Sequence, residues 1–162
     1  MDRAMTLTKA PAARAVMMIP RPVAEVFEAF VDPAITARFW FSASSGRLED
    51  GARVRWDWSW YDVSPDVRVL AFERDTRLSI EWGDETSRTT ATWTFTALSP
   101  DRTFVRIVDA GFEGDGDTRV ARALDSTGGF HLVLAGANAW LEHGIALGLV
   151  PDHLPDDARD LA

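Results

Sequence analysis

The fold is decided by residues 123–144, which read ALDSTGGFHLVLAGANAWLEHG. At about 100° per residue, one apolar stripe runs along this segment. Its members are Phe130, Val133, Leu134, Ala137, Trp140 and Leu141. We expect a helix from about Ser126 to about His143, ended by Gly144. A single helix cannot bury such a stripe by itself, so the rest of the chain must supply an apolar surface for it.

The preceding sequence supplies that surface, because its hydrophobic period changes to two between Ser42 and Phe112. In residues 53–60, RVRWDWSW, one face carries Val54, Trp56, Trp58 and Trp60. Residues 78–82 and 92–96 alternate in the same way, and residues 104–110 form the last expected strand. Short turn signals separate these runs, which favours antiparallel pairing. Residues 69–72, VLAF, do not alternate, so this strand is expected to contain a bulge or to be covered on both faces.

Two short helices are expected between the first strand, residues 15–19, and this series of strands. Pro22 is suited to begin a helix over Val23–Phe30. Asp32 and Pro33 are suited to begin a second helix that ends near Trp40. Residues 118–124 are a candidate short helix before the long one, with Ser126 or Thr127 as the cap of the latter. The chain is thus predicted to be α+β, with a curved antiparallel sheet of about six to seven strands wrapped around the long helix.

Composition narrows the classes of function. The chain has 162 residues, a formal net charge of -8 and no cysteine. The charge disfavours nucleic acid as a partner, and the lack of cysteine excludes disulfides and thiolate chemistry. No apolar run approaches the roughly 20 residues of a membrane span, and residues 1–10 lack the layout of a signal peptide. We expect a soluble, cytoplasmic protein with a flexible leader (1–13), a single domain (14–146) and a loose acidic tail (147–162).

Four local patterns, in order, resemble one known superfamily. They are IPRPVAEVF at 19–27, Asp32-Pro33 followed by Arg38-Phe-Trp40, the segment from Val69 to Trp82, and the segment from Gly129 to Gly144. Together they resemble the START/birch-pollen-allergen (SRPBCC) superfamily over residues 15–145, in the branch related to the activator of heat-shock-protein-90 ATPase. The resemblance implies the helix-grip fold and a cavity for hydrophobic small molecules between sheet and long helix. No cofactor is expected. A homodimer is possible for a member of this superfamily, because some relatives form dimers.

Large aromatic side chains are the candidate ligand contacts. Trp56, Trp58, Trp82, Trp93 and Phe95 fall on the faces assigned inward, where they either line an apolar pocket or fill a solid core. Phe130 and Leu134 face them from the helix. Trp40 and Phe41 form part of an entrance or a hydrophobic cap. Asn138, at the margin of the helical stripe, either anchors a ligand carbonyl or is solvated.

Asp109 is the only candidate for acid–base chemistry. It is in phase with Val105 and Ile107, at a place where related chains often have a histidine. If it faces inward, burial raises its pKa. The alternatives are an ion pair with Arg106 or Arg55, or exposure to solvent. His131, His143 and His153 lack the spacing of metal ligands, so no metal site is expected.

Three functions follow, in order of preference. The first is binding of a hydrophobic small molecule, such as a lipid, an aromatic compound or a polyketide-like compound. The second is a cyclase or dehydratase reaction in the same cavity, with Asp109 as acid or base. The third is a protein-interaction module, such as a chaperone regulator, which requires an exposed apolar patch instead of a pocket.

Overall fold

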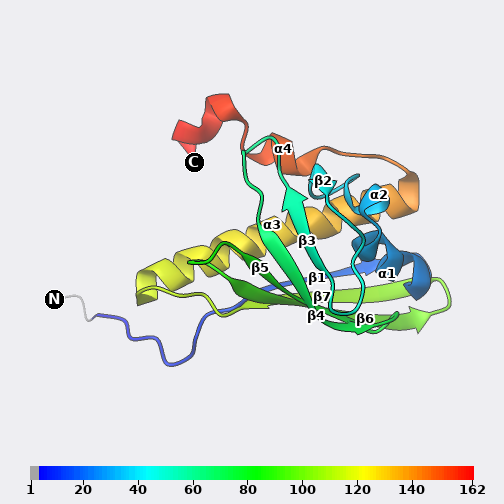
Figure 1. Ribbon diagram of the computed structural model, residues 1–162, viewed down its shortest axis with the longest axis horizontal. Coiled ribbons are helices and arrows are strands. Elements are labelled where there is room, and N and C mark those ends of the chain that lie inside the picture. Colours follow the sequence, from blue (N-terminus) through cyan, green and yellow to red (C-terminus); the bar gives the residue numbers. More distant parts are fainter. Residues whose placement is uncertain (1–3) are drawn as a thin grey trace.

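A computed structural model describes residues 4–162 as a curved antiparallel sheet with one long helix across its concave face (Figure 1). The seven strands have the order β1-β7-β6-β5-β4-β3-β2. The strands are β1 (Ala13–Ile19), β2 (Ala43–Ser44), β3 (Arg53–Asp57), β4 (Asp66–Glu73), β5 (Arg77–Gly83), β6 (Thr89–Ser99) and β7 (Arg102–Ala110). The helices are α1 (Val23–Val31), α2 (Pro33–Thr36), α3 (Gly116–His143) and α4 (Leu149–His153), followed by a 3₁₀ helix, η1 (Asp156–Leu161). The predicted α+β helix-grip fold is confirmed.

The period-two pattern places the sheet's apolar side chains on its concave face. Trp93 and Phe95 on β6 are buried, as are their neighbours Val105 and Ile107 on β7. The register between β4 and β5 shifts between Val69 and Ala71, so the segment that fails to alternate does contain a bulge. Trp60 departs from its predicted place. Strand β3 ends at Asp57, and Trp60 lies in the following turn with 40% of its surface exposed.

Helix α3 is longer than its apolar stripe predicted. It runs without interruption from Gly116 to His143, so the predicted break between two helices is wrong. The cap is Asp115, whose side chain accepts a hydrogen bond from the Thr118 amide at 2.8 Å. Ser126 and Thr127 therefore lie inside the helix and do not cap it. The end at Gly144, which adopts a left-handed conformation with φ 67°, is confirmed.

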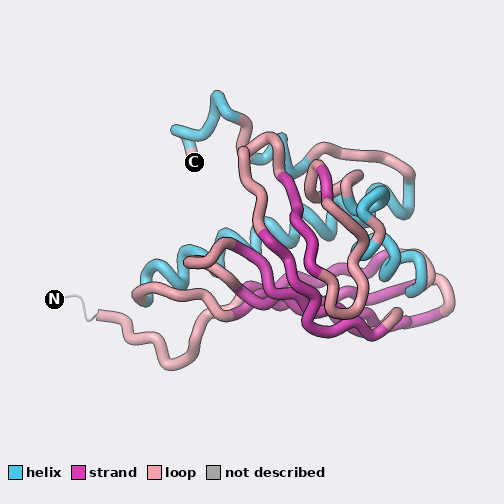
Figure 2. The backbone as a smooth tube through the Cα atoms, in the orientation of Figure 1, coloured by secondary structure: helices cyan, strands magenta, loops and turns pink. Residues whose placement is uncertain are grey.

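Helices α1 and α2 close one end of the sheet (Figure 2). Phe27 of α1 packs edge-on against Phe95 of β6, with ring centroids 5.1 Å apart. Asp32 caps α2 as predicted, accepting a hydrogen bond from the Ala34 amide at 3.0 Å. Helix α2 ends at Thr36, and a hydrogen bond from the Trp40 amide to the Thr36 carbonyl continues the chain as a turn.

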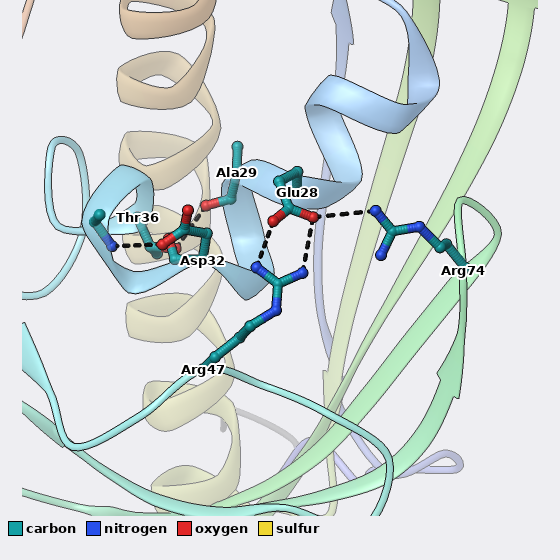
Figure 3. A network of polar contacts seen from close by, with 7 residues as sticks. Glu28, Ala29, Asp32, Thr36, Arg47 and Arg74 are labelled. Atoms are coloured by element: carbon teal, nitrogen blue, oxygen red, sulfur yellow. Dashed lines mark hydrogen bonds and ion pairs between the residues drawn. The ribbon is translucent and has the colours of Figure 1, made fainter.

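A polar network holds α1 to two loops (Figure 3). The Glu28 carboxylate pairs with Arg47, which precedes β3, and with Arg74 in the β4–β5 turn at 3.2 Å. These guanidinium groups lower the pKa of Glu28, chiefly through the hydrogen bond from Arg47. The network connects α1 to the segment before β3 and to the β4–β5 turn.

The two ends of the chain differ in how much secondary structure they contain. Of the expected flexible leader (1–13), residues 1–3 lie outside the described part, residues 4–12 form no helix or strand, and Ala13 begins β1. The expected loose tail (147–162) instead contains α4 and η1, and Val150 of α4 is buried. The Tyr61 hydroxyl donates a hydrogen bond to the Val150 carbonyl, which attaches α4 to the β3–β4 loop.

Candidate ligand-binding cleft

A cleft of about 840 Å³ opens between the concave face of the sheet and α3. Residues of α3 form one side, and residues from β5, the start of β6 and the end of β7 form the other. The β3–β4 loop and α4 border its mouth. The cleft is open to solvent, so a ligand can enter without the sheet and helix separating.

Four aromatic side chains, here called the aromatic wall, line the inner surface of the cleft. Trp40 follows α2, Trp58 follows β3, Trp82 lies on β5, and Phe130 lies on α3. The ring centroids of Trp40 and Phe130 are 5.7 Å apart, those of Trp82 and Phe130 5.8 Å, and those of Trp58 and Trp82 6.2 Å. All three contacts are edge-on or tilted, the arrangement that aromatic rings prefer. Only Trp82 is half-exposed, so its ring is the part of the wall most open to a ligand.

Asp109 lies beside this wall with only 2% of its surface exposed. Its carboxylate accepts a hydrogen bond from Ser126 Oγ of α3 at 2.8 Å and a longer one from Trp82 Nε1 at 3.4 Å. Burial raises the pKa of Asp109, and hydrogen bonds from Thr89, Ser126 and Trp82 oppose this rise. Of the orientations that the sequence left open for Asp109, the structure has the inward one.

The predicted alternative, an ion pair between Asp109 and arginine, is not formed. Arg55 instead pairs with Asp57 at 3.2 Å. Among residues 4–162, no basic side chain lies within ion-pair distance of the Asp109 carboxylate. Its charge is therefore balanced only by neutral hydrogen-bond donors, which is an unfavourable environment for an ionised group.

The mouth of the cleft carries further charged groups, most of them acidic. The acidic residues are Asp62, Asp84 and Asp125. Arg122 is the one arginine in the described lining, and His153 of α4 also belongs to it. Hydrogen bonds from Ser87 Oγ at 2.7 Å and from Thr86 lower the pKa of Asp84, so this carboxylate stays ionised. The lining thus joins an apolar inner wall to an acidic mouth.

The other predicted contact residues lie outside the cleft. Trp56, Trp93, Phe95, Phe41 and Leu134 are buried in the core behind the aromatic wall. The Phe41 and Trp56 rings, for example, pack together at 5.1 Å. Asn138 is also absent from the lining, and its Oδ1 is buried without a hydrogen-bond partner among the described residues. Of the predicted contacts, the cleft therefore brings together Trp40, Trp58, Trp82 and Phe130, with Asp109 beside them.

Sequence reasoning missed the contribution of the C-terminal segment. Tyr61, Val150 and His153 line the mouth, and the last two belong to the expected loose tail. The apolar pair Leu149-Val150 directly before Pro151 was the available signal, because a proline is well accepted in the first turn of a helix. In the described part of the chain, no three His, Asp or Glu side chains gather closely enough to hold a metal ion.

A curved antiparallel sheet that holds a long C-terminal helix, with a cleft between them, defines a helix-grip protein. The sequence pattern of the family described as "Activator of Hsp90 ATPase homolog 1-like protein" matches residues 20–136. The chain therefore belongs to this family, and the resemblance drawn from the sequence is confirmed. No described helix combines the length and the apolar character needed to cross a membrane.

Solved structures with the same fold include three that illustrate its range. The protein SSP2350 from Staphylococcus saprophyticus is 28% identical, with a TM-score of 0.71, over 84% of this chain and 95% of that one. DynU16, described as a putative protein in the dynemicin biosynthetic locus, is 24% identical with a TM-score of 0.72, over 84% of this chain. The alignment covers 49% of DynU16, so this chain spans about half of its length.

The third is the Aha1 dimer from Colwellia psychrerythraea, 14% identical with a TM-score of 0.68 over 82% of this chain and 97% of that one. At that identity the likeness shows the fold alone. No curated protein matches the chain.

Proposed function

We propose that the protein binds a hydrophobic small molecule, such as a lipid, an aromatic compound or a polyketide-like compound, in the cleft between sheet and α3. The observation that carries this proposal is an open cleft of about 840 Å³ with an aromatic inner wall. Clefts of roughly 300–1,000 Å³ with apolar linings and few polar groups are typical of small-molecule sites.

The residues divide this task between them. Trp40, Trp58, Trp82 and Phe130 offer an apolar surface, whose burial against a ligand contributes about 25 cal/mol per Å². Asp109 and Ser126 supply polar atoms at the inner end, where they can orient a ligand. The core aromatic residues behind the wall hold the rings in place and contact no ligand directly.

Blocking the cleft from within tests this proposal. Gly129 lies on the lining, and a Cβ added there meets no atom within 4 Å, so Gly129→Leu is chosen to extend a side chain from this position. Gly128→Leu is the matched control, because Gly128 also has open space but does not line the cleft. Native mass spectrometry of gently purified protein should show a co-purifying small molecule that denaturation releases.

The expected result is that the parent and Gly128→Leu carry the small molecule and that Gly129→Leu does not. Saturable binding of the neutral dye Nile red should follow the same order. A protein that purifies free of ligand and also fails to bind Nile red would overturn the proposal, as would equal binding by the two leucine variants.

Acid–base catalysis in the same cleft is a second candidate, favoured by the position of Asp109. A buried carboxyl with a raised pKa and an opening to the cleft has the properties of a general acid or base. A cyclase or dehydratase reaction would use it to move a proton on the bound substrate. In that case Asp109→Asn abolishes turnover and leaves binding of a neutral ligand intact; unchanged turnover removes Asp109 from the reaction.

Three further expectations stay predictions: a homodimer and a chaperone-regulator role, which depend on the family, and a cytoplasmic location, which depends on the sequence of residues 1–10 and on the absence of a long apolar run. Support for the first two comes from the Aha1 dimer of Colwellia psychrerythraea and from PFC0360w, described as an HSP90 activator from Plasmodium falciparum. Sedimentation equilibrium tests the dimer, with a single monomeric mass as the contradicting result.

A further inference from the structure

The inner end of the cleft combines a buried acid with the aromatic wall, of which Trp82 is the half-exposed member. Asp109 is a carboxylate that no described basic side chain pairs with, although burial of an unpaired charge is costly. Its hydrogen-bond donors Ser126, Trp82 and Thr89 are neutral, so they supply no compensating charge. A cation delivered from the cleft would supply the missing charge.

The aromatic wall is arranged to accept the same cation. The indole N–H of Trp82 points toward Asp109, so the N–H edge of this ring lies beside the carboxylate and joins the buried acid to the aromatic wall. Trp58 and Phe130 flank that ring, with centroids 6.2 Å and 5.8 Å away. The face of a tryptophan ring attracts an ammonium group within about 6 Å, and this attraction strengthens when water is excluded. The carboxylate of Asp109 and the faces of the neighbouring aromatic rings therefore both favour a cationic group on the ligand.

The charges at the mouth favour the approach of a cation. From the β3–β4 loop, the β5–β6 loop and α3, the carboxylates of Asp62, Asp84 and Asp125 face the opening. Arg122 of α3 is the one described arginine that opposes them, and His153 comes from α4. The whole chain has a net charge of -8. A field of this sign raises the encounter rate of cationic ligands and lowers that of anionic ones.

We propose that the ligand of this cleft is a hydrophobic amine: an apolar, preferably aromatic body with one protonated amino group that contacts both the Asp109 carboxylate and an aromatic face of the wall. This inference depends on the proposed small-molecule function and names the class of ligand. The body of the ligand contacts Trp40, Trp58 and Phe130, and the ammonium donates hydrogen bonds to the Asp109 carboxylate.

Binding of such a ligand requires the ionised form of Asp109, and this gives the site a pH dependence. The titratable or charged groups that line the cleft with it are Asp84 after β5, Arg122 and Asp125 on α3, Tyr61 and Asp62 in the β3–β4 loop and His153 on α4. Because burial raises the pKa of Asp109, the carboxyl of the free protein keeps its proton up to a higher pH than an exposed aspartate does. The amine then displaces that proton, so its affinity should rise as pH increases until Asp109 is fully ionised.

Isothermal titration calorimetry with three probes of one shape tests the inference. The probes are 2-(2-naphthyl)ethylamine, 2-(2-naphthyl)ethanol and 2-naphthylacetate, which are cationic, neutral and anionic at neutral pH. The amine should bind tightest, about tenfold tighter than the alcohol, as expected when a cation meets both a carboxylate and an aromatic face. Asp109→Asn should remove this preference and leave the affinity for the alcohol within about threefold, whereas Asp50→Asn, at an exposed carboxylate outside the lining, should change little.

The possible failures are distinguishable. Equal binding of amine and alcohol by the parent protein overturns the amine inference and leaves the small-molecule function standing. If 2-naphthylacetate binds tightest, the amine inference is also overturned and the polar contact is assigned to Arg122. Absence of binding by all three probes contradicts both proposals. Because the probe series on the parent protein decides the matter alone, the test does not depend on whether Asp109→Asn folds.

Discussion

At the scale of single residues, Asp109 is the most unusual feature of the molecule. Strand β7 places its carboxylate on the concave face, in register with Ala91 of β6 and Ala13 of β1. These small neighbours leave space above Asp109, which Ser126 and Trp82 border with their hydrogen-bond donors. The same residue thus destabilises the empty fold in its ionised form and offers a ligand its strongest polar contact.

The burial of Asp109 should make the free energy of unfolding depend on pH in a definite direction. Burial raises the pKa of Asp109, so the folded state binds more protons than the unfolded state between the two pKa values. The free energy of unfolding therefore falls as pH rises from the unfolded-chain value of about 3.9 through the raised value. Asp109→Asn removes the titratable carboxyl, and with it this decrease in the free energy of unfolding. Urea unfolding from about pH 4 to 8 should show the variant gaining stability relative to the parent as pH rises. A difference that is constant over this range would contradict the account.

At the scale of elements, α3 faces the cleft on one side and the core on the other. Two of its glycines have different surroundings. A Cβ at Gly128 meets open space, whereas a Cβ at Gly136 lies 3.0 Å from Phe39 Cβ and 3.3 Å from the Phe39 carbonyl oxygen. The close approach at Gly136 lets α3 pack against the turn that positions Trp40. The glycine there has a packing role that Gly128 does not have.

Matched alanine variants test this difference. Gly128→Ala should stabilise the protein by roughly 0.5–1 kcal/mol, because alanine is the better residue in a helix interior. Gly136→Ala should destabilise it by about 1–3 kcal/mol, because backbone atoms of Phe39 must move. Urea midpoints measure both. Equal stabilisation by the two variants would mean that α3 does not approach Phe39 as described.

The sequence predicted the strands better than the helix, and the physical reason differs for each. Buried and exposed residues alternate on a sheet with one wet face, so Trp93 and Phe95 could be assigned inward from the sequence alone. The first turns of α3, from Gly116, carry mostly exposed residues and lack an apolar stripe, so periodicity could not reveal them. Their helical state depends on the Asp115 cap and on continuity with the buried part of α3.

The same limit applies to the site. Trp56 and Trp58 share one face in sequence, yet Trp56 is covered by Phe41 while Trp58 reaches the cleft. Which aromatic residue meets a ligand depends on what the segment after α2 covers, and this is a long-range contact that alternation does not encode. The sequence predicts that these side chains face inward, but it does not predict which of them line the cleft.

At the scale of the whole molecule, the C-terminal segment completes the mouth of the cleft. The Tyr61 hydroxyl bonds to the Val150 carbonyl, and the Arg159 guanidinium lies 5.6 Å from the centre of the Tyr61 ring. Tyr61→Phe removes the first contact and keeps the ring. We expect faster amide hydrogen exchange in residues 149–161, with little change in the rest of the protein. Exchange in this segment that is unaffected by Tyr61→Phe would show that other contacts hold it.

The central claim, that the cleft binds a hydrophobic small molecule, is tested most directly by the indole N–H signals of the seven tryptophans in a ¹H–¹⁵N NMR spectrum. Single Trp→Phe variants assign the signals, and 2-(2-naphthyl)ethanol is then added stepwise. The account predicts saturable shifts for Trp40, Trp58 and Trp82, which line the cleft, and none for the exposed Trp60 or for Trp140. Shifts confined to Trp60 and Trp140, or no shift at any concentration, would contradict it.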